Sequence, residues 1–99
     1  MAEFRIELTE EARSDLLFYP AFERKIITTG IRAQLSHQPV IKTNNRKPLR
    51  INPVAPWELR IGRFRVFYEA DEPSGTVTII SVGHKERNLL FVRGEEVKL

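Results

Sequence analysis

The stretch that decides the fold is WELRIGRFRVFYEADE, residues 57–72. Apolar and polar residues alternate on both sides of Gly62-Arg63, which predicts two β-strands, Trp57–Ile61 and Phe64–Glu69. A two-residue connection that begins with glycine is typical of a type II′ hairpin turn. The stretch therefore predicts an antiparallel hairpin in which Ile61 pairs with Phe64.

This pairing divides the hairpin into two faces, because cross-strand partners share a face and successive pairs alternate. The apolar face, which we expect to meet helices, carries Trp57, Leu59, Ile61, Phe64, Val66 and Tyr68. The other face carries Glu58, Arg60, Arg65 and Phe67. Arg60 lies opposite Arg65, and like charges in that position cost roughly a few tenths of a kcal/mol. Two guanidinium forks also suit the oxygens of one phosphate, so the second face predicts a phosphate site.

The residues before the hairpin predict one strand, two helices and a loop. FRIEL, residues 4–8, alternates as a short strand does. Thr9 is a good N-cap for a helix over residues 10 to 18 or 19, whose first turn is acidic. Apolar residues at helical spacing predict a second helix from residue 21 to about residue 36, after Pro20.

Residues 37–56 contain four prolines and an Asn-Asn pair, which predicts an extended basic loop with room for one short edge strand. Loops longer than about 15 residues are usually functional or disordered. Residues 71–75, DEPSG, predict a second turn before a third strand over residues 76–84. The order strand, helix, helix and three-stranded meander predicts an α+β fold. We expect one domain over residues 1–99, with two N-terminal helices packed on an antiparallel sheet that the first strand joins or flanks.

The composition excludes several kinds of chemistry. The chain has no cysteine, so neither disulfides nor thiolates contribute. With only two histidines, His37 and His84, we expect no metal site, and nothing predicts a small-molecule cofactor. No apolar run approaches the roughly 20 residues of a membrane span, and the first residues lack the pattern of a signal peptide. We therefore expect a cytoplasmic protein without membrane contact.

The charges are segregated along the chain. Residues 1–23 hold six acidic and two basic residues, whereas residues 42–65 hold seven basic residues and one acidic residue. A basic segment of this kind is typical of proteins that bind polyanions, although a solvated loop with scattered charge would look the same. His84, Lys85 and Arg87 directly follow the third strand, and we expect them beside the hairpin arginines at one edge of the sheet. Taken singly, each of the three is also compatible with an ordinary solvated surface residue.

The ordered set of these features resembles the RelE/ParE superfamily of bacterial toxins. It consists of LRIGRFRVFYEADE followed by IISVGHKERN, behind an acidic-capped helical hairpin, and covers nearly the whole chain. The resemblance implies a RelE-like fold. RelE-like members cut messenger RNA in the ribosomal A site with the RNA's own 2′-hydroxyl and without metal, whereas ParE-like members poison DNA gyrase. Both kinds are neutralised by a small antitoxin, so the expected partners are an antitoxin, messenger RNA and the ribosome.

The resemblance also assigns roles to individual residues. Arg65 matches the family arginine that stabilises the phosphate, and Arg60 falls where RelE-like members often have a lysine. Lys85 falls where RelE has an arginine, one position after the residue, His84, that fits the general acid of the YoeB-like branch. Glu58 replaces a lysine that is proposed as the base in RelE.

Two further positions depart from the family pattern. Lys47 falls where the YoeB-like branch has a glutamate base, and Phe91 stands where RelE has a C-terminal tyrosine. The second departure removes a hydroxyl from the RelE-style mechanism. The expected catalytic residues are Arg65, Arg60, His84, Lys85 and Glu58, with Glu58 as base and His84 as acid. The expected RNA-binding residues are Lys47, Arg50, Arg63, Arg87 and Arg46.

Three functions fit these expectations. The first is a ribosome-dependent messenger RNA endoribonuclease, slow by itself because a glutamate beside two arginines is a weak base and the ribosome must align the substrate. The second is a gyrase-poisoning toxin, or a catalytically inactive relative that mainly binds its antitoxin. The third is a basic RNA-binding module without catalysis.

Overall fold

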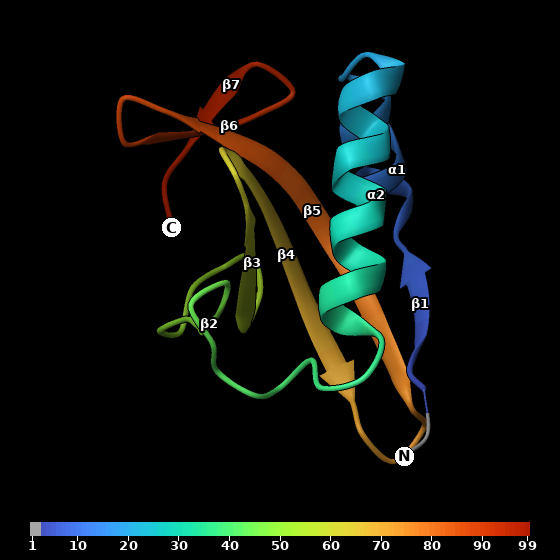
Figure 1. Ribbon diagram of the computed structural model, residues 1–99. Helices are drawn as coiled ribbons and strands as arrows, with labels where there is room; N and C mark the ends of the chain where they lie inside the picture. Colours follow the sequence, from blue (N-terminus) through green and yellow to red (C-terminus); the bar gives the residue numbers. More distant parts are fainter. Residues whose placement is uncertain (1–2) are drawn as a thin grey trace.

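The computed structural model describes residues 3–99 and confirms the α+β fold (Figure 1). The two helices are α1 (Glu10–Leu17) and α2 (Ala21–Leu35). The strands are β1 (Arg5–Leu8), β2 (Arg46–Pro48), β3 (Trp57–Ile61), β4 (Phe64–Asp71), β5 (Thr76–Glu86), β6 (Leu89–Val92) and β7 (Glu95–Val97). Both helices lie on the same side of the sheet, and the basic loop with the short edge strand β2 lies beyond β3 (Figure 1).

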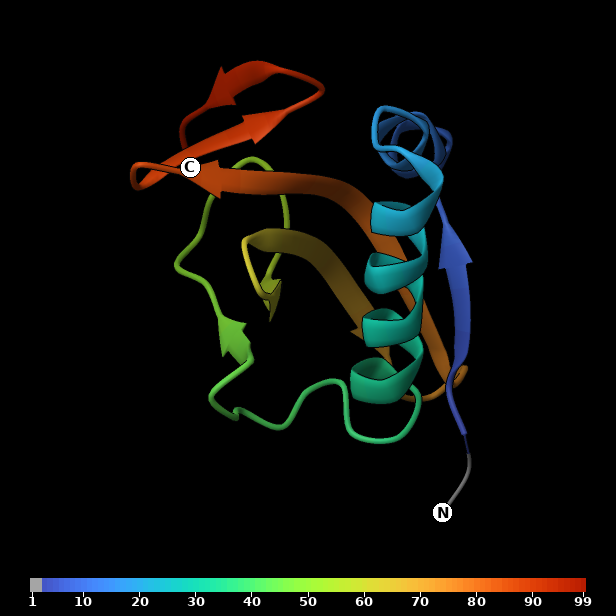
Figure 2. The same cartoon turned by 45° about the horizontal axis from the view of Figure 1, so that its top comes forward.

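The strands form one sheet in the order β2-β3-β4-β5-β6-β7, with antiparallel neighbours along this path. Strand β1 flanks the meander, which is one of the two expected arrangements. Unlike the other strands, it runs parallel to its partner, β5, with which it pairs from Arg5↔Thr76 to Leu8↔Ile79. Strand β6 pairs with β5 farther along, at residues 84–86. β1 and β6 therefore follow one another along the edge of β5 that β4 leaves free (Figure 2).

The decisive hairpin has the expected register. Ile61 pairs with Phe64, and the pairs continue outward to Trp57 and Tyr68. Gly62 has φ +58°, as the first central residue of a type II′ turn requires. Because this conformation is costly for residues with a Cβ, glycine at position 62 fixes the turn and therefore the register.

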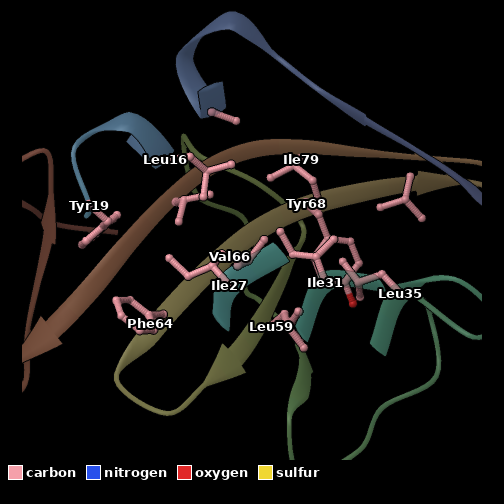
Figure 3. Packing of buried hydrophobic residues seen from close by; sticks show 13 residues of the cluster. Leu16, Tyr19, Ile27, Ile31, Leu35, Leu59, Phe64, Val66, Tyr68 and Ile79 are labelled. Atoms are coloured by element: carbon pink, nitrogen blue, oxygen red, sulfur yellow. The ribbon is translucent and has the colours of Figure 1, made fainter. Parts of the chain in front are cut away.

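The apolar face of the hairpin packs against the helices, as expected. Leu59, Val66 and Tyr68 of the sheet are fully buried against Ile27 and Leu35 of α2 (Figure 3). Helix α1 contributes Ala12 and Leu16 to the same core. The side chains thus fill the space between one sheet face and two helices, which leaves the opposite sheet face without helical cover.

The last 15 residues contain two strands that the sequence did not lead us to expect, and β5 extends to Glu86 rather than ending at His84. Two-residue turns at Arg87-Asn88 and Arg93-Gly94 connect β5, β6 and β7. All four turn residues have positive φ, between 49° and 81°. This is the type I′ geometry, for which asparagine and glycine are favoured, so Asn88 and Gly94 were usable signals.

A buried carboxylate fills the gap between β1 and β6 on the edge of β5. Asp15 of α1 is 1% exposed, and its Oδ2 accepts the backbone N–H of Val82 and the hydroxyl of Ser81, both at 3.0 Å. Its Oδ1 lies 3.0 Å from Nε of Arg93, in the last hairpin turn. Asp15 therefore takes the place of a neighbouring strand and fastens the C-terminal hairpin to α1.

Replacement of Gly30 by alanine is expected to destabilise the protein, although alanine favours helices by about 1 kcal/mol over glycine. A Cβ at position 30 would lie 2.6 Å from Cδ1 of Ile61 and 2.9 Å from its Cγ1. We expect a net loss of about 1–2 kcal/mol in the free energy of unfolding, measured with urea. Ile61→Val removes the nearest atom, so it should restore part of the loss in the double variant. A more stable Gly30→Ala protein would contradict the tight contact.

Candidate functional site: an arginine pair on the uncovered sheet face

The sheet face that turns away from the helices is here called the outer face. Its centre is apolar, because Phe67 is fully buried there against Ala55 and Leu90. The side chains of Arg60 and Arg65 belong to this face, since Arg60 pairs with Arg65 and both alternate with core residues. The outer face therefore has a basic end, next to the turn at Gly62.

The guanidinium group of Arg60 is partly engaged by an ion pair within β3. Its Nε lies 3.3 Å from Oε1 of Glu58, two residues earlier on the same face of β3. Glu58 is 4% exposed, whereas the Arg60 side chain is 44% exposed. The buried carboxylate thus holds the arginine at Nε, while its exposed end can meet a ligand. Glu58 is placed as an ion-pair partner rather than as a free base.

Arg65 is held by the turn that precedes it. Its Nη1 donates to the carbonyl oxygens of Gly62 at 2.8 Å and Phe64 at 2.9 Å. Its Nε is buried and has no hydrogen-bond partner within the described part of the chain. Burial lowers the pKa of Arg65, the charge of Glu58 opposes this shift, and the charge of Arg60 adds to it. An anion beside the guanidinium would stabilise Arg65 in this environment, because it would supply a counter-charge.

Two lysines share the outer face with this pair. Lys47 of β2 lies opposite Glu58 in the register, and Lys85 of β5 lies opposite Leu90, whose side chain packs on the outer face. Gly83, two residues before Lys85, pairs with Arg65. The structure therefore brings Arg60, Arg65, Lys47 and Lys85 to one face, as a site for a phosphate backbone requires.

His84 does not join them, and the expectation that it lies with the arginine pair is wrong. It pairs with Phe64, so its side chain is on the helix side of the sheet. There Nδ1 lies 2.7 Å from the hydroxyl of Tyr19, the ring stacks on Phe91, and Nε2 lies 3.2 Å from Oε1 of Glu86. Strand alternation is the cause, because residues 83 and 85 share the outer face and residue 84 cannot.

Two of the expected RNA-binding arginines have structural partners instead. Arg46 is 8% exposed, and its guanidinium donates to the carbonyl oxygens of Ile41 and Gln34, so it ties the loop to the end of α2. Arg63 forms an ion pair with Glu23 of α2 at 2.8 Å, on the helix side of the hairpin turn. Arg46 and Arg63 therefore have structural roles and do not belong to the expected RNA-binding surface. Arg50 is exposed in the loop, and Arg87 is exposed in the β5–β6 turn.

A comparison with known protein families identifies the family of this chain. Residues 6–89 match the model of the ParE toxin of the type II toxin–antitoxin system parDE. The chain belongs to the ParE toxin family. It is thus a toxin of a type II toxin–antitoxin system, within the RelE/ParE superfamily that the hairpin and the strand after it resemble.

Two solved toxin–antitoxin complexes contain chains whose structures are similar to that of the toxin. The toxin–antitoxin complex RelBE2 from Mycobacterium tuberculosis contains a chain with 28% identity and a TM-score of 0.75, and the match covers 86% of the toxin and 94% of that chain. The archaeal RelE–RelB complex from Pyrococcus horikoshii OT3 gives 17% identity and a TM-score of 0.66, covering 85% and 97%, which shows a shared fold. A search of curated proteins found no match.

Two further findings concern residues 3–99 of the toxin. No helix there is both long and apolar enough to cross a membrane. No cluster of three or more histidine, aspartate or glutamate side chains has the arrangement of a metal site in this part of the chain.

Sequence reasoning missed two features of the toxin. Tyr19 was read only as the end of a helix, but its ring is 3% exposed and its hydroxyl contacts His84. Residues 49–55 were read as irregular loop, but Asn52 orders them and Ile51 stands fully exposed at their tip. The Asn-Pro pair at residues 52–53 was a usable signal for a turn.

Tyr19 should make the stability of the toxin depend on pH in the alkaline range. Burial raises its pKa to about 12, the charge of Arg63 opposes this, and nearby carboxylates add to it. The unfolded chain has a tyrosine pKa near 10, so the contribution is complete below pH ~10 and is lost as the pH rises to about 12. Between pH 8.5 and 11.5 the wild type should lose roughly 2 kcal/mol more unfolding free energy than Tyr19→Phe, measured with urea. Parallel losses in both proteins would refute this.

Proposed function

We propose that this toxin binds messenger RNA on the ribosome through its outer face and promotes cleavage of the RNA there. The observation that supports the proposal is the Arg60–Arg65 pair, two arginines at directly paired positions of one sheet face whose charges repel each other. A phosphate between the two guanidinium groups would relieve this repulsion. Lys85 and Lys47 extend the positive charge along the same face.

The chemistry proposed here rests on charge more than on proton transfer. Attack of the RNA's 2′-hydroxyl on the neighbouring phosphorus, with loss of its proton to water, forms a pentavalent phosphorane with added negative charge, and cations aimed at that charge lower the barrier. The phosphorane then collapses with cleavage of the bond to the 5′-oxygen, which takes a proton from water, so the products are a 2′,3′-cyclic phosphate and a 5′-hydroxyl. Glu58 is the carboxylate beside the pair, but its oxygen is engaged by Arg60. His84 is on the helix side, so it is not proposed as the acid. We therefore expect cleavage to depend on alignment of the RNA by the ribosome.

A cognate antitoxin is the second proposed partner. The two solved relatives were crystallised as complexes of a toxin with its antitoxin. The exposed apolar side chains of Leu17, Phe18, Phe22 and Ile26 on the helical side are the kind of surface that an amphipathic partner segment covers. We propose that the antitoxin suppresses the growth arrest that the free toxin causes.

The test is inducible expression of the toxin, with and without the neighbouring open reading frame, followed by mapping of RNA 5′ ends. We expect growth arrest, new 5′ ends in phase with codons, and suppression of both by the antitoxin. Growth arrest without any codon-phased ends would reject RNA cleavage as the cause.

Poisoning of DNA gyrase is the second candidate function. Two observations favour it: His84 is separated from the arginine pair, and Phe91 lacks the hydroxyl that RelE has there. A toxin that only binds its target needs neither an acid beside the arginines nor that hydroxyl. The same expression experiment decides, since a DNA-damage response without RNA cleavage would select this candidate.

A further inference from the structure

Residues 49–55 form an ordered projection beside the arginine pair, built around the side chain of Asn52. Its Oδ1 accepts the N–H groups of Val54 at 2.8 Å and Ala55 at 3.0 Å. Its Nδ2 donates to the carbonyl oxygens of Arg50 at 2.7 Å and Ala55 at 2.9 Å. One amide thus satisfies four backbone groups, which fixes the loop without a neighbouring strand.

The projection is also fastened to the outer face of the sheet. Leu49 and Val54 pack against the cluster of Ala55, Phe67 and Leu90. At its base, the N–H of Leu49 donates to the carbonyl oxygen of Pro56 at 2.8 Å. The apolar residues on both sides of the tip therefore point into the protein.

Ile51, at the tip, does the opposite. Its relative exposure is 106%, so it contacts almost nothing of its own chain. An isolated exposed apolar residue is common. Here, however, an ordered loop holds the residue outward, and Ile51 lines a hollow of about 470 Å³. The other lining residues are Lys47, Pro48, Leu49, Arg50, Asn52 and Leu99. A hollow of this size is within the range of ligand pockets, about 300–1,000 Å³.

The charge of the hollow selects an anionic ligand. Lys47 and Arg50 both line it, and among residues 3–99 neither forms an ion pair with an acidic side chain or with the carboxylate of Leu99, which also lines the hollow. Leu49 and Ile51 provide apolar surface beside these cations. A phosphate next to a flat apolar base is the ligand that presents both features together.

The hollow is also close to the arginine pair. Lys47 lies opposite Glu58, and Arg60 lies two residues farther along β3 on the same face. From strand spacing and rise per residue, the Cα atoms of Lys47 and Arg60 are roughly 8 Å apart. A neighbouring nucleotide of an extended strand can span this distance.

We propose that the hollow beside Ile51 binds a second, unstacked nucleotide of the RNA strand whose phosphate the arginine pair holds. Lys47 and Arg50 bind its phosphate, and Ile51 covers one face of its base. This inference rests on the proposed RNA-directed function, which it extends from one phosphate to the recognition of an adjacent base.

The test is binding of an eight-nucleotide single-stranded RNA that carries one 2-aminopurine, placed at each position in turn. At one position, the wild type should raise the fluorescence, because the base leaves its stacked neighbours. Ile51→Ser should remove this rise and weaken binding about fivefold, while leaving the slope of log K against log salt unchanged. Arg50→Gln should make that negative slope less steep by about 0.7, the value for one phosphate contact on a single strand.

Ile41→Ser is the matched control, because Ile41 is 51% exposed in the same long loop but does not line this hollow. It should change neither fluorescence nor affinity. If Ile51→Ser behaves like the wild type in both readouts, the second site is rejected while RNA binding stands. If the wild type does not bind the RNA, the second site is rejected, and mapping of RNA 5′ ends decides the proposed function separately. If Ile51→Ser loses toxicity but binds RNA normally, Ile51 contacts a protein, and the nucleotide site is rejected.

Discussion

Arg65→Gln is expected to abolish growth arrest and to lower RNA cleavage on the ribosome by about 10²–10³-fold. Loss of one preorganised group that stabilises charge in a transition state has an effect of this size. Arg65 forms no ion pair with an acidic side chain within residues 3–99, so its charge remains available to an anion. The measurements are colony formation after induction and the yield of codon-phased 5′ ends.

The control for this variant is Arg5→Gln. Arg5 is also a strand arginine, and it forms an ion pair with Glu7 at 3.2 Å, but it lies on β1, which β5 separates from the hairpin. It should leave toxicity unchanged. Arg65→Lys keeps the charge without the fork and should recover only part of the activity. Because Arg65 also braces the turn at Gly62, a urea titration must show that Arg65→Gln is folded. Full toxicity of a folded Arg65→Gln protein would remove the arginine pair from the mechanism.

Asp15→Ala is expected to lower the free energy of unfolding by about 3 kcal/mol, the largest effect on stability among the changes considered. Removal of one partner from a buried, hydrogen-bonded charge pair typically costs about 3–5 kcal/mol. Arg93 is half exposed and can turn to water, which places the expected value at the lower end. In the alanine variant the buried N–H of Val82 loses its acceptor, which accounts for much of the lost stability. A domain of this size should melt about 12–24 °C lower.

Asp71→Ala is the control, because Asp71 is exposed at the end of β4 and should change stability by less than about 0.5 kcal/mol. Asp15→Asn keeps an acceptor for Val82 and should lose less than the alanine variant. Amide exchange adds a local readout, since the Val82 N–H should exchange faster once its acceptor is gone. An Asp15→Ala protein as stable as the Asp71→Ala protein would contradict the role of this carboxylate at the sheet edge.

The central hairpin and the helices could be predicted from the sequence because their signals are local. Alternation on both sides of Gly62-Arg63 determines the register, and the N-cap at Thr9 marks the start of α1, where its hydroxyl accepts the N–H of Ala12. The parallel pairing of β1 with β5 could not be derived in this way. It joins residues about 70 positions apart, and the intervening sequence carries no sign of which edge β1 will occupy.

The candidate site was predicted in part for a similar reason. The hairpin register alone places Arg60 opposite Arg65, and this was correct. The face on which His84 lies depends on the register between β4 and β5. The sequence leaves this register open, because a bulge at Phe67/Tyr68 shifts the pairing of the two strands. The burial of Arg46 depends on carbonyl groups of α2 and the loop, which no spacing in the sequence reveals.

The pairing of β1 with β5 also constrains the order in which a newly made chain acquires its structure. Strand β1 has no partner until residues 76–79 have been synthesised, and the ion pair of Asp15 with Arg93 can form only after residue 93 has been added. Contacts of such long sequence separation form late and slowly. A growing polypeptide therefore lacks the finished sheet until residue 93 has left the ribosome.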